Sequence, residues 1–368
     1  MTKTVYIGMD VHSTNYTLSS YTCETDNCFS TVKLGPEVKN ILKYINRIKE
    51  VHGDDVEIVT GYEAGCLGYT LYKDLKKEGI KCIIIAPTTL PKQKAGEIKT
   101  DKRDAQKIAR ALGTGTYKSV YVPDQEDDDV KQYIRMRDDH KLTLKKTKQQ
   151  ITAFCLRNGF TFTDGKSKWT QKHIKWLRSL EMTAMQREIL DEYLITFDYY
   201  TLRIKQMDEK IEEISHQVRY AEKVSKLCCF AGMSTHKSLC HIVETGDFSR
   251  FAKAPSYSAY LGTVPGEDSS STSVNRLPIT KAGNSHLRML DIEAAHAIGR
   301  TSKQKSRTLM ERQKGCSSEI IAYADKANAR MRKMYKDISQ RKNKNVAAAA
   351  VARELACFIW GMMTDHIS

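Results

Sequence analysis

The order of strand and helix patterns in the first third of the chain limits its possible folds most. Three short apolar or alternating runs come first, separated by turn-like segments that contain Asn and Asp, at Val5–Met9, Tyr16–Tyr21 and Phe29–Leu34. Such runs between turn residues predict three consecutive strands. Apolar residues at helical spacing follow in 36–51, and Pro36 suits the first turn of a helix there.

The next part of the chain alternates between the two patterns. Val56–Thr60 and Cys82–Ala86 predict buried strands, and Tyr69–Lys77 predicts an amphipathic helix between them. Asp101–Leu112 is rich in Ala, Lys and Arg and predicts one more helix. The resulting order, βββαβαβ, predicts an α/β domain with a mixed sheet covered by helices, as in ribonuclease-H-like nucleases.

A seven-residue repeat dominates the middle of the chain. It has two apolar positions, occupied by Leu190, Phe197, Ile204, Ile211 and Val218 and by Tyr193, Tyr200, Met207 and Ile214. Four such heptads predict a coiled coil. Two interpretations stay open, namely a coiled coil between two copies of the chain and a long helix packed within one chain.

Two other segments have charged residues in informative positions. Trp169 and Trp176 are seven residues apart beside several lysines, which predicts one helical face that either stacks on bases or packs in a core. The acidic run Glu126–Asp129 indicates either a hinge between domains or the acidic first turn of a helix.

The charge of the chain favours a polyanionic partner. Its 368 residues contain 59 Lys and Arg against 44 Asp and Glu, which gives a formal net charge of +15. Within Arg300–Lys344 there are 14 Lys and Arg against 4 Asp and Glu. Such a basic segment is suited to contacts with a nucleic-acid backbone.

Composition excludes several classes of protein. A hydrophobic content of 40% argues against disorder, and no apolar run approaches the roughly 20 residues of a membrane span. The N-terminus has no secretory pattern, and the ten cysteines form no CxxC pair. We therefore expect a cytoplasmic protein, without a membrane partner, whose thiols are reduced.

Four acids follow or begin predicted elements. Asp10 ends the first strand, Glu63 follows the fourth, and Asp101 and Asp104 are three residues apart on a helix. If they converge, only protons or cations can neutralise them, and oxygen ligands select Mg²⁺ or Mn²⁺. Alternatively, Glu63 caps a helix, and Asp101 and Asp104 complement a helix dipole.

The chain resembles the DEDD transposases of bacterial insertion sequences. The similarity is to the "one-ten" group, which is guided by a structured bridge RNA and is related to Piv-type DNA invertases. It rests on the motifs GMDVHS, YEAGCLG, KTDKRDAQKIAR, GDFSRFAKAPSYSAYLGTVPGEDSSS, ITKAGNSHLR and NVAAAAVARELACFIW, which cover nearly the whole chain.

This resemblance implies three domains. They are a RuvC-like domain with the ribonuclease H fold over 1–125, a helical linker with a coiled coil over 126–222, and a mostly α-helical transposase domain over 223–368. Asp10, Glu63, Asp101 and Asp104 would be catalytic and would bind Mg²⁺ or Mn²⁺.

The resemblance also implies a serine nucleophile that forms a phosphoserine link to DNA. The best candidate is Ser270, with Ser269 and Ser271 left open. The family has a Gly-Gly pair after this serine, and this chain has none.

The implied function is RNA-guided recombination that excises and inserts the element itself. Its partners would be donor and target DNA, a bridge RNA and further copies of the chain, in a dimer or tetramer at the bacterial nucleoid. The side chains expected to contact nucleic acid are those of Lys99, Lys102, Arg103, Lys281, Asn284 and Arg288.

Three alternatives stay open. The first is a Piv-like site-specific invertase that needs no guide RNA. The second is a RuvC-like structure-selective nuclease, in which Ser270 is only a loop residue. The third is a protein that binds nucleic acid and has no catalytic activity.

Overall fold

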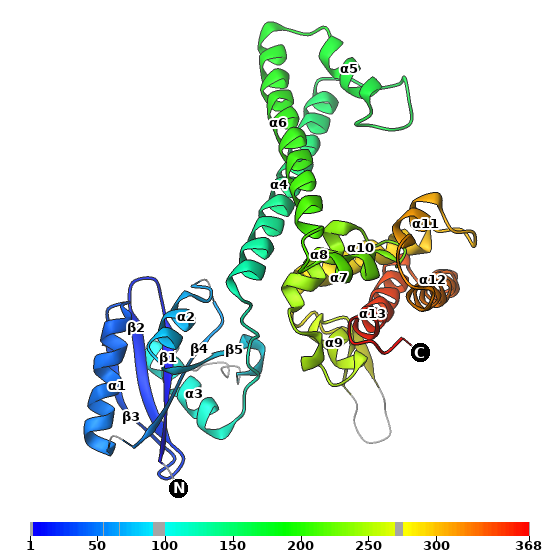
Figure 1. Cartoon of the computed structure of the whole chain (residues 1–368). Helices are drawn as coiled ribbons and strands as arrows, with labels where there is room; N and C mark the ends of the chain where they lie inside the picture. The colour runs from blue at the N-terminus through cyan, green and yellow to red at the C-terminus, as the bar shows by residue number, and fades with distance from the viewer. Residues whose placement is uncertain (1–2, 54, 66, 91–99, 269–274, 368) are drawn as a thin grey trace. The chain divides into compact units, whose positions relative to one another are not determined.

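The computed structural model describes residues 3–53, 55–65, 67–90, 100–268 and 275–367. The chain divides into two compact units, Met1–Val122 (unit 1) and Pro123–Ser368 (unit 2), each with its own apolar clusters. Unit 1 contains the larger sheet, whereas unit 2 is mostly helical (Figure 1). This confirms the predicted fold class.

The sheet of unit 1 is mixed and has the strand order β3-β2-β1-β4-β5. Strands β1, β2 and β3 form an antiparallel meander, while β4 and β5 run parallel to β1. The elements are β1 (Thr4–Val11), β2 (Tyr16–Thr22), β3 (Asn27–Leu34), α1 (Val38–His52), β4 (Glu57–Glu63), α2 (Thr70–Lys77), β5 (Lys81–Ile85), a 3-10 turn (Pro87–Thr89) and α3 (Asp101–Thr114). Their order is the predicted βββαβαβ, followed by the predicted helix.

Alternate residues of β1 point to opposite faces of the sheet. Val5, Ile7 and Met9 are fully buried in one cluster with apolar residues of α1 and α2. Gly8 lies on the other face, where α3 packs so closely that a Cβ would be 2.2 Å from the Ala105 carbonyl oxygen. Side chains at even positions of β1 therefore point towards α3.

The heptad repeat lies mainly on α6 (Ala184–Ser215), which packs along α4 (Gln125–Arg157) of the same chain (Figure 1). Phe197 and Ile211 are buried, and Arg137 of α4 makes two hydrogen bonds, of 2.8 and 3.0 Å, to the Asp208 carboxylate of α6. The repeat thus forms a helical hairpin within one chain. Val218 is an exception, because it follows the end of α6 and is 99% exposed.

The shared helical face of Trp169 and Trp176 is not present. The helix α5 (Gln171–Ser179) begins after Trp169, which has a φ of +67°. Both indole rings instead contact the ring of the buried His173, at 5.2 and 5.4 Å between centroids. The acidic run forms the first turn of α4, where the Asp124 side chain accepts a hydrogen bond from the amide of Asp127.

The rest of unit 2 is mostly helical, and α7, α9, α10 and α12 contact the C-terminal helix. Its elements are α7 (Ala221–Cys228), α8 (Thr235–Thr245), a 3-10 turn (Phe248–Arg250), α9 (Ala254–Tyr260), β6 (Pro265–Glu267), β7 (Arg276–Ile279), α10 (Ser285–Gly299), α11 (Arg307–Gln313), α12 (Ser318–Ser339) and α13 (Lys344–Met363). By length and hydropathy α13 could cross a membrane. However, Val351, Leu355 and Ile359 are fully buried, and α13 contacts α9, α10 and α12. It is therefore a core helix of unit 2.

Candidate active site

Two of the four predicted acids lie at the ends of neighbouring parallel strands. Asp10 is on β1 and Glu63 ends β4, one residue beyond the registered pair Met9 and Tyr62. Residues at equal register on parallel strands point to the same face of a sheet. Asp10 lies two residues after Gly8, and so shares the face that α3 covers.

The other two acids are in the first turn of α3. The Thr100 side chain caps this helix by accepting a hydrogen bond from the amide of Arg103. Asp101 and Asp104 are thereby placed on one side of the helix start, where they also complement its dipole. Asp104 is 3.8 Å from the Nζ of Lys107.

Asp10 and Asp101 lie on either side of His12. The His12 Nε2 is 3.4 Å from the Oδ2 of Asp10 and 3.9 Å from the Oδ1 of Asp101. One ligand atom from each of these three residues lies within 4.8 Å of the others. Lys33 of β3 donates a 3.1 Å hydrogen bond to the Oδ2 of Asp101. The structure thus brings a strand acid and a helix acid together.

The electrostatics match a site of crowded negative charge. Burial raises the pKa of Asp10, and the charges of Asp101 and Asp104 raise it further against the opposing effect of His12. The hydrogen bond from Lys33 lowers the pKa of Asp101. The charge of Asp104 therefore also acts on Asp10.

These side chains fit a hard divalent cation. The carboxylates supply oxygen ligands, and their mutual repulsion would be relieved by a positive ion between them. The His12 side chain is 52% exposed and offers a nitrogen next to both Asp10 and Asp101. Glu63 has an exposed side chain at the neighbouring strand end.

The second predicted group and the serine segment belong to unit 2. Residues 269–274, which include Ser269, Ser270 and Ser271, lie outside the described residues. The segment joins β6 to β7, and the amide of Asp268 donates to the carbonyl of Asn275 across its two ends.

The three residues predicted from ITKAGNSHLR differ in their surroundings. Lys281 is exposed and has a φ of +56°. Asn284 caps α10 and donates a 2.6 Å hydrogen bond to Glu244. Arg288 donates to the carbonyls of Leu261 and Ala282, which joins α10 to the preceding loop.

Among the predicted contacts in unit 1, Lys102 and Arg103 are exposed in the first turn of α3, next to the acids. Lys99 lies outside the described residues. The contact of Lys33 with Asp101 was not predicted, because nothing in the sequence of β3 indicates which residue it faces. A cluster in unit 2 around Asp138 was also missed, because its residues are far apart in the sequence.

Comparisons with known proteins identify two family matches and several relatives. Residues 7–160 match the family DEDD_Tnp_IS110, described as a transposase, and residues 225–311 match the family described as "Transposase IS116/IS110/IS902 family". The transposase for insertion sequence element IS1533 from Leptospira borgpetersenii is 32% identical over 356 residues, which cover 94% of this chain and 99% of that protein. The protein y4qE of Sinorhizobium fredii, named as an inferred transposase, is 32% identical over 86% of this chain and 78% of its own length. The transposase for IS1111A from Coxiella burnetii is 24% identical over 87% of this chain and 83% of its own.

Proposed function

The chain belongs to the IS110 family of insertion-sequence transposases, and on this premise we propose that it excises and inserts its element by RNA-guided exchange of DNA strands. As a transposase, it is an enzyme of DNA phosphoryl transfer. The observation that carries the proposal is the approach of Asp10 and Asp101, with Glu63 at the next strand end and Asp104 one helical turn along.

A DEDD transposase uses a divalent metal, and we infer that Asp10, Glu63, Asp101 and Asp104 hold Mg²⁺ or Mn²⁺. When bound, such ions stabilise the negative charge that develops on the attacking and leaving oxygens. The sheet and α3 hold the acids in place before DNA arrives. Lys33 offsets the charge of Asp101 in the protein alone.

The proposed nucleophile is the hydroxyl of Ser270. Its oxygen attacks a DNA phosphorus, forms a phosphoserine ester and displaces the hydroxyl oxygen of the neighbouring nucleotide. The serine proton passes to a base, and the leaving oxygen takes up a proton. Because one ester replaces another, the strands can rejoin without ATP.

Backbone contacts would position the DNA and the guide RNA. Lys102, Arg103 and Lys281 are exposed cations. Lys102 and Arg103 lie in the first turn of α3 with the acids of unit 1, and Lys99 precedes them in the sequence. Lys281 belongs to unit 2. Asn284 and Arg288 would shape the neighbouring loop as well as approach a phosphate. Base pairing by a bridge RNA would then select the donor and target sequences.

Self-association into a dimer or tetramer is supported by the outward face of α6. Ile195, Tyr199 and Leu202 are 54–60% exposed there, at a spacing of four and three residues. Such a stripe is typical of a helix that packs on another helix. We place the assembly on the bacterial nucleoid, in the cytoplasm.

A trapping assay tests the nucleophile. The full-length protein is incubated with Mg²⁺, guide RNA and DNA that carries the element end, then denatured, digested and sequenced by mass spectrometry. We expect DNA on Ser270, and we expect Ser270→Ala to abolish this adduct while Ser269→Ala and Ser271→Ala retain it. Undiminished cleavage by Ser270→Ala would instead indicate a RuvC-like nuclease.

The guide RNA is tested by purification. We expect the full-length protein, expressed together with its complete element, to retain one discrete RNA after ribonuclease and salt washes that remove bulk RNA. Recombination should stop when this RNA is removed and return when it is added back. Full recombination without RNA would support a Piv-like invertase.

A further inference from the structure

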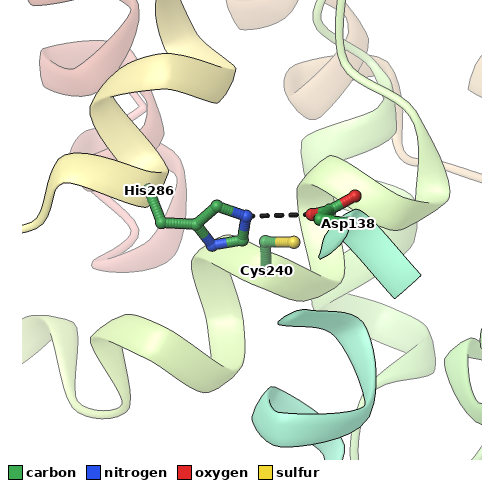
Figure 2. A group of neighbouring side chains, drawn as sticks. All are labelled: Asp138, Cys240 and His286. Carbon is green, nitrogen blue, oxygen red and sulfur yellow. Dashed lines mark hydrogen bonds and ion pairs between the residues drawn. The ribbon is translucent and has the colours of Figure 1, made fainter. Parts of the chain in front are cut away.

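A second cluster of ligand-type side chains lies inside unit 2. Asp138 comes from α4, His236 and Cys240 come from α8, and His286 comes from α10. The Nε2 atoms of His236 and His286 lie 3.0 and 2.9 Å from the same Oδ2 of Asp138. The Cys240 sulfur is 3.9 Å from the Nε2 of His236. Figure 2 shows Asp138, Cys240 and His286 converging from three helices, with one donor atom of each within 4.8 Å of the others.

These donors are the types that zinc selects. Structural zinc sites combine thiolate, imidazole and carboxylate donors, and their ligand atoms lie roughly 3–4 Å apart around the ion. His236 and Cys240 are four residues apart on α8 and so share one face of that helix. Cys240 is fully buried, and the other three side chains are only 12–14% exposed. The cluster is therefore nearly closed to solvent, as structural metal sites are.

A surrounding shell holds these side chains in position. The Nδ1 of His286 is 2.7 Å from the Oε1 of Glu244, so its Nε2 points to the centre of the cluster. Arg137 donates to the Oδ1 of Asp138, which leaves Oδ2 for the centre. Glu244 is itself held by two 2.9 Å hydrogen bonds from Arg135. A carboxylate behind a metal-bound histidine is the usual device that fixes its ring orientation.

We propose that Asp138, Cys240 and His286, whose donor atoms lie within 4.8 Å of one another, bind one transition-metal ion of the zinc class, and that the neighbouring His236 turns to supply the fourth ligand. One thiolate and one carboxylate neutralise a divalent ion, and the two imidazoles complete four ligands. The ion would join α4 of the helical hairpin to α8 and to the start of α10. This site is distinct from the carboxylate site of unit 1, and it does not depend on the strand-exchange chemistry.

The alternative is a metal-free ion pair. If no metal binds, His286 donates to Glu244 and Asp138 at once and must carry a positive charge. Although burial opposes this charge, the hydrogen bonds to Asp138 and Glu244 raise the pKa of His286 to about 9. Metal binding would displace protons from His286 and from the Cys240 thiol.

Cobalt spectroscopy distinguishes these two states. The full-length protein is purified without chelator, stripped of metal and titrated with cobalt chloride. We expect a thiolate-to-cobalt charge-transfer band and the visible bands of tetrahedral Co²⁺, which saturate at one ion per chain and disappear when zinc chloride is added. Cys240→Ser should remove the charge-transfer band, whereas Cys155→Ser, a matched buried cysteine on α4, should retain it.

Two further variants secure the result. Glu244→Gln keeps all four ligands and is expected to weaken cobalt binding about 10- to 100-fold, as is typical when a partner behind a ligand is lost. Asp10→Asn should leave the cobalt spectrum unchanged, because it alters only the carboxylate site of unit 1. Folded wild-type protein that shows no tetrahedral cobalt bands and retains no zinc would overturn the proposal in favour of the ion pair.

Discussion

Replacing Asp10 with Asn is expected to lower the rate of metal-dependent DNA cleavage by about 10³-fold or more, the range seen when one member of a catalytic unit is lost. Asn has nearly the same shape but is neutral, so it removes the charge that would hold the cation at the end of β1. The rate is measured with the full-length protein on DNA carrying the element end, at saturating Mg²⁺.

The fold should survive this substitution. Because burial and the neighbouring Asp101 and Asp104 already disfavour the charged form of Asp10, neutral Asn is expected to leave the thermal unfolding midpoint unchanged or higher. The matched control is Asp74→Asn, an acid on α2 that is paired with Lys77 at the surface. Cleavage by Asp10→Asn at a rate close to that of this control would contradict a catalytic role for Asp10.

Replacing Gly8 with Ala is expected to disrupt unit 1 and its site together. The added Cβ would lie 2.2 Å from the carbonyl oxygen of Ala105 and 2.2 Å from the amide nitrogen of Ala109. These are backbone atoms of α3, so relief requires the whole helix to move from the sheet. Overpacking of this kind typically costs about 1–3 kcal/mol, and a clash with backbone lies at the upper end.

Chemical denaturation and the cleavage rate both report this effect. Movement of α3 carries Asp101 and Asp104 away from β1, so we expect a lower free energy of unfolding and a loss of cleavage. Gly65→Ala is the control for stability. An added Cβ there would lie 3.9 Å from the Glu63 carbonyl oxygen, which is the nearest heavy atom outside Gly65 and its two chain neighbours. Equal stability of the two variants would show that α3 does not dock on Gly8 as described.

The elements of unit 1 could be predicted because their signals are local. Val5, Ile7 and Met9 alternate with residues of the other face, and apolar residues of α1 recur at helical spacing. The contact between Gly8 and α3 could not be predicted, since a glycine in a strand does not indicate what approaches it. In the same way, the heptads predicted α6, but not that α4 of the same chain would cover it.

The acids of the candidate site were recognisable because they stand at strand ends and at a helix start. Lys33 and His12 reach Asp101 only through the folding of β3 and the β1–β2 turn, which no spacing in the sequence reveals. The cluster in unit 2 was hidden for a similar reason. Asp138 and His286 are far apart in sequence, and only the four-residue spacing of His236 and Cys240 was visible.

Trp169 illustrates a local signal that misled. A spacing of seven residues from Trp176 fits one helical face, but the Thr170 side chain caps α5 by accepting a hydrogen bond from the amide of His173. The helix therefore begins after Trp169, and the chain turns there with a positive φ. Cap residues can override an apolar spacing at the end of a helix.

Anomalous diffraction from crystals of the full-length protein grown with manganese chloride tests the gathering of the four acids most directly. We predict a manganese peak bound by the carboxylates of Asp10 and Asp101, with Glu63 or Asp104 completing the ligands, and its loss in crystals of Asp10→Asn. The contrary result would be well-ordered crystals at saturating Mn²⁺ in which these carboxylates bind no ion and pair only with Lys33 and His12. That result would contradict a metal-dependent site in unit 1.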